Sequence, residues 1–259
     1  MRAGASAPPL LHFSRMHRVL IPPHAVRGGE ITVTDPGDLH HLLDVLRVGI
    51  GDRLECFDGA GRNYAGRILR SGRQAVTIAI DERTEEPPLR LAITLAQALI
   101  KPEPFEWVIQ KATELGVTQI LPTLTSRTRV RVSPGTETAR MKRWRRIAEA
   151  AAAQCGRASL PSITEPQPFE EALKAVGSRC ALLPTLAEQG DSLERLAGRV
   201  RQAGDVIVLI GPEGDFSPEE VALAKRCGAQ PVTLGRATLK SETAAIATLA
   251  ILQHLVGAL

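Results

Sequence analysis

Two glycine-bearing loops in the last quarter of the chain carry residue types that could form a binding site. The first is Gly-Pro-Glu-Gly-Asp at 211–215, which follows the apolar run 205–210, and the second begins at Leu234-Gly235. Neither contains the Gly-Lys-Ser/Thr of a phosphate-binding loop or the spacing of a dinucleotide-binding fingerprint. The loops offer backbone amides and carbonyls, close approach at glycine, and the carboxylate of Glu213. Such groups suit a neutral or cationic small molecule better than a triphosphate.

The segments that flank the first loop predict its place in the fold. Residues 205–210, apolar from Val206 onward, predict a fully buried strand, and Ser217, Pro218 and Glu220 carry the pattern of a capped helix start. The loop between them therefore belongs at the carboxyl edge of a sheet, where open α/β sheets bind ligands. This stretch alone leaves open an alternative, a tight strand-to-helix turn that simply needs glycine.

The C-terminal part of the chain alternates strand-like and helix-like segments. Apolar residues recur at helical spacing in 102–117, and Gly116 stands where a C-terminal cap would lie. The expected strands are 89–99, 117–124, 179–185, 205–210 and 230–235, and the expected helices are 102–117, 136–156, 192–203, one from Ser217 and one near Ser241. Because the apolar strands alternate with helices, they predict a parallel α/β sheet.

The preceding residues follow a different pattern, with short strand-like runs and glycine turns. Residues 53–69 predict two strands joined by a tight turn, 74–80 predict another strand, and 36–48 predict one short helix. The charged stretch 81–88 ends in Pro-Pro and is typical of a linker. We therefore expect a disordered extension at 1–16, a mostly β domain at 17–86 and an α/β domain at 87–259.

Composition and charge restrict the kind of partner. The chain has 259 residues, 44% of them hydrophobic, and a net charge of +4 with a pI near 9.1, a mild lean toward polyanions. Aromatic residues make up only 3%, so stacking on aromatic rings cannot be the main way of binding RNA bases. Arginine, with its planar fork of donors, would have to carry such binding.

We expect neither a metal site nor a membrane span. The four cysteines are scattered without a C-x-x-C pair, and His40 and His41 are adjacent, so they would point in different directions. This use of cysteine fits a reducing compartment such as the cytoplasm. No apolar run reaches the roughly 18 residues that a membrane-spanning helix needs.

Several separated motifs carry a resemblance to a known family. They are IQKATELGVTQILP (109–122), RWRRIAEAAAAQCGRASLP (143–161), LIGPEGDFSPEE (209–220) and LGRATLKSETAAIATLAIL (234–252). In this order they resemble the RsmE-type methyltransferases of the SPOUT superfamily, and residues 39–69 are similar to that family's PUA-like RNA-binding β-barrel. The resemblance covers residues 17–257.

The resemblance implies both a fold and an activity. The fold is a SPOUT-type parallel sheet with a deep trefoil knot at its C-terminal end, which the residue pattern alone does not predict. The activity is methylation of N-3 of a uridine in 16S ribosomal RNA by S-adenosylmethionine, giving 3-methyluridine. A homodimer is implied as well. The helix at 242–256 is apolar nearly all round and must be covered on two sides, which agrees with a dimer.

The same motifs identify candidate site residues. For S-adenosylmethionine we expect Leu183, Gly211, Pro212, Glu213, Gly214, Leu234, Gly235, Thr238, Leu239 and Thr243. For RNA we expect Arg18, Arg47, Arg143, Arg146 and Arg157. For catalysis we expect Lys240, with Arg236 as the alternate cation and Glu242 beside them. Each set has a plainer interpretation: core leucines, a solvated helix face, a loop lysine and a helix-start carboxylate.

The chain departs from the family pattern in both loops. The family usually has glycine where Asp215 stands, and Arg, Ile, Leu and Arg where this chain has Ala237 to Lys240. Lys240 keeps a charge but lacks the bidentate fork of arginine. One alternative function is therefore a non-catalytic RNA-binding protein that retains the fold. A nucleotide-using ligase or kinase is another, and the missing phosphate-binding loop disfavours it.

Overall fold

The computed structural model describes residues 17–130 and 137–259. The chain divides into two compact units, Met1–Glu85 and Glu86–Leu259, which we call the N-terminal and C-terminal units. The extension expected at 1–16 lies outside the described residues. No helix in the described part of the chain is both long and apolar enough to cross a membrane.

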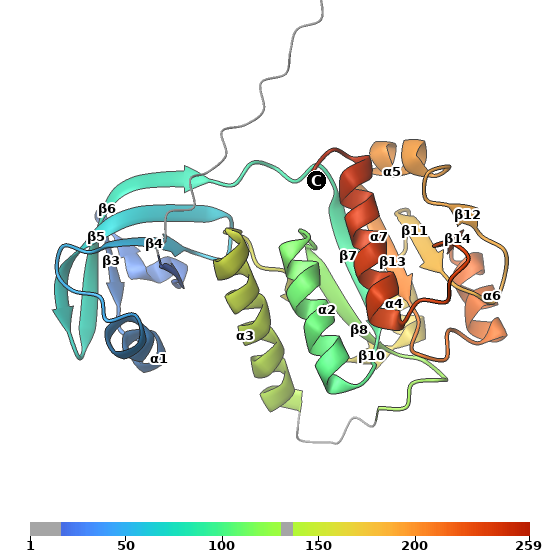
Figure 1. The fold of residues 1–259 in the computed structure, drawn as a ribbon, viewed down its shortest axis with the longest axis horizontal. Helices are drawn as coiled ribbons and strands as arrows, with labels where there is room; N and C mark the ends of the chain where they lie inside the picture. Colours follow the sequence, from blue (N-terminus) through green and yellow to red (C-terminus); the bar gives the residue numbers. More distant parts are fainter. Residues whose placement is uncertain (1–16, 131–136) are drawn as a thin grey trace, which may run out of the picture. The chain divides into compact units, whose positions relative to one another are not determined.

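The N-terminal unit is built on a six-stranded sheet with the order β1-β4-β5-β6-β3-β2. Its strands are β1 (Arg18–Leu20), β2 (Val26–Arg27), β3 (Glu30–Val33), β4 (Arg53–Phe57), β5 (Arg62–Gly72) and β6 (Ala75–Glu85). Short helical turns lie at Pro23–Ala25, Pro36–His40 (α1) and His41–Val45. The sheet curls around a fully buried core that includes Ile31, Leu42, Leu54 and Ile78 (Figure 1). The β-rich character expected from the sequence is confirmed.

The prediction of a linker at 81–88 is wrong for residues 81–85, which belong to strand β6. Strand β6 continues to Glu85 and pairs with β5 throughout. Asp81 forms an ion pair with Arg67 at 3.1 Å across this ladder. Glu85 forms another with Arg62 at 3.3 Å. Because the last five residues of β6 are exposed and mostly charged, their composition resembles that of a linker.

The C-terminal unit contains an all-parallel sheet with the order β10-β8-β7-β13-β11-β14-β12, and β9 also pairs with β8. The strands are β7 (Ala92–Ala98), β8 (Gln119–Leu124), β9 (Ser162–Ile163), β10 (Gln167–Pro168), β11 (Cys180–Pro184), β12 (Asp191–Ser192), β13 (Asp205–Ile210) and β14 (Ala229–Thr233). The helices are α2 (Pro102–Glu114), α3 (Glu137–Cys155), α4 (Phe169–Lys174), α5 (Ala197–Ala203), α6 (Pro218–Arg226) and α7 (Ser241–Leu255). The parallel α/β sheet predicted from the sequence is confirmed.

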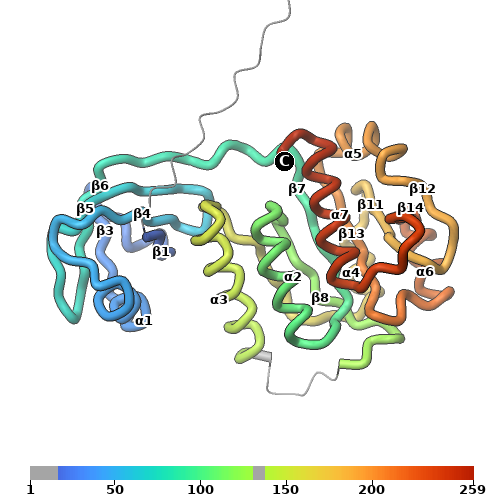
Figure 2. Tube along the Cα trace, viewed as in Figure 1, coloured from blue at the N-terminus to red at the C-terminus, as the bar shows by residue number. Residues whose placement is uncertain are grey.

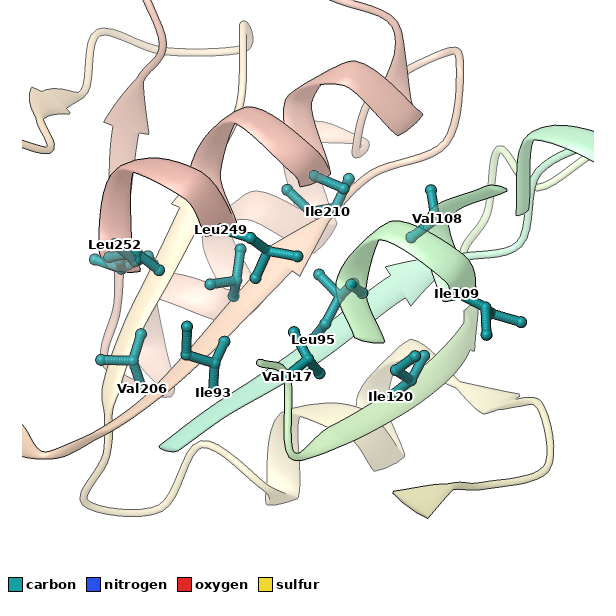
Figure 3. Close-up of a cluster of buried hydrophobic side chains, with 14 of the residues drawn as sticks. Ile93, Leu95, Val108, Ile109, Val117, Ile120, Val206, Ile210, Leu249 and Leu252 are labelled. Atoms are coloured by element: carbon teal, nitrogen blue, oxygen red, sulfur yellow. The ribbon is translucent and has the colours of Figure 1, made fainter. Parts of the chain in front are cut away.

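Strand β13 shows why its sequence is apolar at every position after Asp205. Val206, Val208 and Ile210 join the cluster under α2 and α7, where Leu249 and Leu252 of α7 meet the sheet (Figure 3). The alternate residues of β13 belong to a second cluster, on the opposite face, with α4 and α6. Side chains alternate across a strand, so a strand covered by helices on both faces must be apolar throughout.

Two of the expected helices are shorter than the sequence suggests. The helix expected at 36–48 ends at Val45, and Arg47 then takes a left-handed backbone with φ 55°. The helix expected at 192–203 begins only at Ala197, because Asp191 and Ser192 pair with β14 as strand β12. Competition from strand pairing is a tertiary effect, and helical periodicity alone cannot reveal it.

Candidate functional site

Three loops meet at the carboxyl ends of the adjacent strands β11, β13 and β14, and with the start of α7 they enclose a pocket. Strand β11 ends at Pro184, β13 at Ile210 and β14 at Thr233. The lining residues are Pro184, Thr185, Leu186, Ile210, Gly211, Pro212, Glu213, Asp215, Val232, Thr233, Leu234, Gly235, Ala237, Thr238, Leu239, Ser241 and Ala244. Both glycine-bearing loops of the sequence analysis therefore contribute to one site, as carboxyl-edge placement requires.

The turn after β13 forms one wall. The Asp215 amide donates to the Pro212 carbonyl at 3.0 Å and closes the turn. Gly211 is buried, and a Cβ there would lie 3.2 Å from the Asp215 carboxylate and from the Phe216 ring. The turn is supported from outside by Arg127, whose guanidinium donates to the Gly214 carbonyl at 2.7 Å. These contacts hold the loop in one conformation.

A capped helix follows this turn. The Ser217 hydroxyl accepts from the Glu220 amide at 3.2 Å, and the Glu220 carboxylate accepts from the Ser217 amide at 2.8 Å. The capping box expected from the sequence is confirmed. The second oxygen of the same carboxylate accepts from the Ser126 amide at 2.7 Å, which ties the start of α6 to the loop after β8. Glu220 is buried, and hydrogen bonds from the Ser217 and Ser126 amides compensate for the loss of water around its charge.

Buried hydrogen bonds join the pocket-lining residue Ser241 to its neighbours. The Ser241 hydroxyl, at the first residue of α7, donates to the Gly211 carbonyl at 2.5 Å. It also accepts from the Gln97 side-chain amide at 2.9 Å, at the carboxyl end of β7. Gln97 is fully buried and Ser241 is only 6% exposed. The start of α7, the turn after β13 and strand β7 are thus joined by hydrogen bonds that water cannot easily replace.

The loop after β14 forms the opposite wall and leads into α7. Gly235 has φ 112°, a conformation that any side chain would strain, and its amide lies 3.3 Å from the Thr233 hydroxyl. Leu234 and Leu239 are half-buried, whereas Arg236 and Lys240 are exposed. Lys240 is the N-cap residue of α7 and stands between two pocket-lining residues.

The structure brings most of the expected cofactor-binding residues together. Gly211, Pro212, Glu213, Leu234, Gly235, Thr238 and Leu239 line the pocket. Three do not: Leu183 is buried inside β11, Gly214 faces Arg127, and Thr243 is exposed on α7. The sequence analysis did not single out the lining residues Pro184, Thr185, Leu186 and Ser241, and it named Asp215 and Ala237 only as departures from the family pattern. The carboxyl-edge rule, applied to the strand expected at 179–185, would have indicated the first three.

The expected catalytic residues flank the pocket but are not among its lining residues. Arg236 and Lys240 are exposed on the loop before α7, and Glu242 lies half-buried in the first turn of that helix. A carboxylate in the first turn of a helix interacts favourably with the helix dipole. The two cations lie at the pocket rim, next in sequence to the lining residues Gly235, Ala237, Leu239 and Ser241.

The arginines expected to bind RNA are in different environments. The Arg18 side chain is only 7% exposed, donates to the Asn63 side-chain carbonyl at 2.6 Å and lies over the Phe57 ring. Arg157 donates to two backbone carbonyls, at 2.8 and 3.1 Å, and burial lowers the pKa of its guanidinium. These two arginines stabilise the fold. Arg143 forms an ion pair with Glu106 at the surface. The other two arginines, Arg47 and Arg146, are exposed.

The cysteines and acidic residues do not suggest further chemistry at the site. Burial raises the pKa of the Cys56 thiol to about 12 and also raises the pKa of Cys180 in β11, so neither is an activated nucleophile. Within the residues that the structure describes, no three His, Cys, Asp or Glu side chains are grouped as metal ligands.

The fold and site define a class: an α/β protein that binds a small molecule at the carboxyl edge of a parallel sheet. Residues 86–253 match the family model described as an RNA methyltransferase domain, and residues 33–81 match an RNA methyltransferase PUA domain. The chain therefore belongs to the RNA methyltransferase family. The resemblance found in the sequence motifs is confirmed.

Individual relatives and solved structures are more specific than the family model. The chain is 32% identical, over 94% of its length and 79% of the relative's, to the ribosomal RNA small subunit methyltransferase E of Synechocystis sp.. It is 30% identical to the Mycobacterium tuberculosis protein of the same name, over 85% of each chain. A putative methyltransferase of Legionella pneumophila, solved with bound S-adenosylmethionine, superposes with a TM-score of 0.83 at 32% identity, covering 93% of this chain and 98% of that one. The ribosomal RNA small subunit methyltransferase E of Neisseria gonorrhoeae, bound to S-adenosyl methionine, gives 0.79 at 28% identity with the same coverage.

Proposed function

We propose that this protein transfers the methyl group of S-adenosylmethionine to N-3 of a uridine in 16S ribosomal RNA, in the cytoplasm. The observation that carries the proposal is the pocket built from the loops after β11, β13 and β14, in a chain that superposes over most of its length on two cofactor-bound relatives. The cofactor occupies the cleft between 211–215 and 234–243. The pocket offers backbone groups and carboxylates, which suit an adenosyl group and a cationic sulfonium.

The residues around the pocket favour catalysis by positioning and charge stabilisation. In the reaction the bond from sulfur to the methyl carbon breaks, a bond from N-3 to that carbon forms, and the N-3 proton passes to water. Loss of this proton spreads negative charge over the flanking carbonyl oxygens of uracil. No His or Cys lines the pocket among the described residues, which disfavours covalent catalysis and a strong general base and leaves positioning of the reactants and stabilisation of negative charge. Lys240 supplies the stabilising cation, with Arg236 as the alternate.

We expect S-adenosylmethionine to bind the purified protein without a metal. Isothermal titration calorimetry should give the same dissociation constant with and without EDTA, because the proposed contacts are all from the protein. S-adenosylhomocysteine should compete, and ATP should not, since the loops lack a phosphate-binding lysine. Loss of binding on chelation, or a preference for ATP, would contradict the assignment and favour the ligase or kinase alternative.

Transfer of tritium from labelled cofactor to unmodified small ribosomal subunits tests the reaction itself. The proposal expects label in 3-methyluridine after nuclease digestion of the RNA. Parallel reactions with naked 16S RNA and with assembled subunits identify the substrate form. Cofactor binding together with RNA binding, but without transfer to either form, would favour the non-catalytic alternative.

RNA recognition is proposed for the N-terminal unit and for α3. The unit of residues 17–86 serves as the PUA-like RNA-binding domain, and 87–259 as the methyltransferase domain. Arg47 in the first domain and Arg146 on α3 are exposed and can contact phosphates. Arg143 could do so after exchanging its ion pair with Glu106, an exposed pair of low net value.

We also infer the deep trefoil knot of the SPOUT fold. Chain order and spatial order differ at the end of the unit: after β14, which lies between β11 and β12, the chain returns over the sheet to place α7 beside α2 and β13 (Figure 2). Gly190, in the loop after β11, packs against the backbone of Pro231 and Val232 in β14. The placement of β11 between β13 and β14, both of which come later in the chain, supports the inference.

A homodimer through α7 is proposed as well. Leu249 and Leu252 of this helix are fully buried against its own sheet, whereas Ile251 on another side is 39% exposed. Sedimentation velocity at micromolar concentration should show a dimer, and Ile251→Glu should weaken it at least about tenfold because it places a charge in an apolar interface. Leu69→Glu, at a 45% exposed leucine of the N-terminal unit, is the matched control. A wild-type monomer would contradict the proposal.

A further inference from the structure

Asp215 is unusual in both its backbone and its side chain. Among the described residues it is one of two non-glycine positions with positive φ, at 58°. This left-handed conformation favours glycine, although aspartate and asparagine tolerate it better than other residues. The chain therefore places a charged side chain on a turn whose backbone favours glycine.

The added carboxylate joins two walls of the pocket. One of its oxygens accepts from the Thr185 hydroxyl and from the Leu186 amide, each at 2.8 Å. The other accepts from the Phe216 amide, also at 2.8 Å. The Thr185 hydroxyl in turn accepts from the Ala187 amide at 3.1 Å. The segment 185–187, which follows β11, is therefore hydrogen-bonded to the turn that follows β13.

We propose that Asp215 is a positioning residue that holds the loop after β11 against the turn after β13 and so forms the S-adenosylmethionine pocket before the cofactor arrives. This inference rests on the proposed function. Bonds from a carboxylate to amides and a hydroxyl are stronger than neutral ones. Leu186 is 62% exposed, and the segment 185–187 buries little apolar surface. The hydrogen bonds to Asp215, rather than apolar packing, therefore hold this segment in place. A loop ordered in advance lowers the entropic cost of binding.

The first measurement is amide hydrogen exchange of the cofactor-free protein. Asp215→Gly removes the carboxylate and suits the left-handed turn. It should speed exchange at Leu186 by about tenfold or more, the effect of losing one charge-assisted hydrogen bond. Asp205→Asn is the matched control, because it removes a carboxylate paired with Arg179 at the opposite end of β13 and should leave Leu186 unchanged.

The second measurement separates a positioning role from a general loss of structure. For Asp215→Gly the KM and dissociation constant of S-adenosylmethionine should rise about tenfold, while kcat at saturating cofactor stays within about twofold of the wild type. Thr185→Val, which removes one donor to the carboxylate, should raise the dissociation constant by less. In the Asp215→Gly background it should add almost nothing, because the two residues act as a pair.

The outcomes are distinguishable. Unchanged exchange at Leu186 in Asp215→Gly, or unchanged cofactor affinity in that variant, would overturn the inference. So would a fully additive Thr185→Val effect. Failure of the proposed function appears elsewhere, as the absence of S-adenosylmethionine binding by the wild-type protein, whereas the exchange measurement needs no cofactor.

Discussion

Replacing Lys240 with alanine is expected to lower kcat about 100-fold, the range for removing one donor that stabilises developing charge. The dissociation constant of S-adenosylmethionine should stay unchanged, because Lys240 is exposed at the rim and is not one of the pocket-lining residues. The loss therefore belongs to the transition state, where the attacking uracil carries negative charge. Single-turnover methyl transfer to the small ribosomal subunit measures it, with calorimetry for cofactor affinity.

The place of Lys240 in α7 separates this prediction from a loss of stability. As the N-cap residue, its ammonium group stands near the positive end of the helix dipole, so alanine should leave the free energy of unfolding within about 1 kcal/mol of the wild type. Lys240→Arg should be tolerated or improved, since arginine keeps the positive charge and adds a bidentate fork of donors. Lys174→Ala, at an exposed lysine of α4, controls for general loss of positive charge. Near-normal turnover in Lys240→Ala would contradict the role of Lys240 and leave Arg236 as the candidate cation.

Gly190→Ala is expected to lower the free energy of unfolding of the C-terminal unit by about 3 kcal/mol, the upper part of the range for overpacking. A Cβ at Gly190 would lie 2.7 Å from backbone atoms of both Pro231 and Val232. These atoms belong to β14, which is paired with β11 and β12, and they cannot move aside as the end of a flexible side chain can. Cofactor binding should weaken too, because Val232 lines the pocket.

Urea denaturation followed by tryptophan fluorescence measures this change. The two tryptophans of the chain, Trp107 and Trp144, both lie in the C-terminal unit, so the signal reports that unit alone. Gly198→Ala is the matched control: this glycine lies inside α5 with open space at its Cβ position, and alanine there should stabilise by about 0.5–1 kcal/mol. Equal stabilities of the two variants would disprove the packing argument.

Local features of the site could be predicted because short segments encode them. The capping box at Ser217 and Glu220 forms within four residues and needs no distant partner. Gly116 ends the α2 region with φ 82°, as a C-terminal cap residue does. The apolar strand 205–210 is covered on both faces. Each of these depends on neighbours in the sequence or on the period of side chains along a strand.

The functions of single arginines could not be predicted in the same way. Arg157 donates to the carbonyls of Thr113 and Val117, and Arg18 is enclosed by Asn63 and Phe57. In both cases the partner is more than 35 positions away in the chain. An arginine reads the same in the sequence whether its guanidinium is solvated or buried against carbonyl groups. Only the packed structure distinguishes these two environments.

By itself the sequence determined the class of fold, the two glycine-bearing loops and, through its motifs, the family. The order of strands in the sheet was decided by tertiary structure, and this order places β11 between β13 and β14. The loop after β11 thereby became the third wall of the pocket, and Asp215 acquired Thr185 and Leu186 as partners. The physical reason is that a parallel sheet joins strands separated by long crossovers, so residues that meet at its edge share no local pattern.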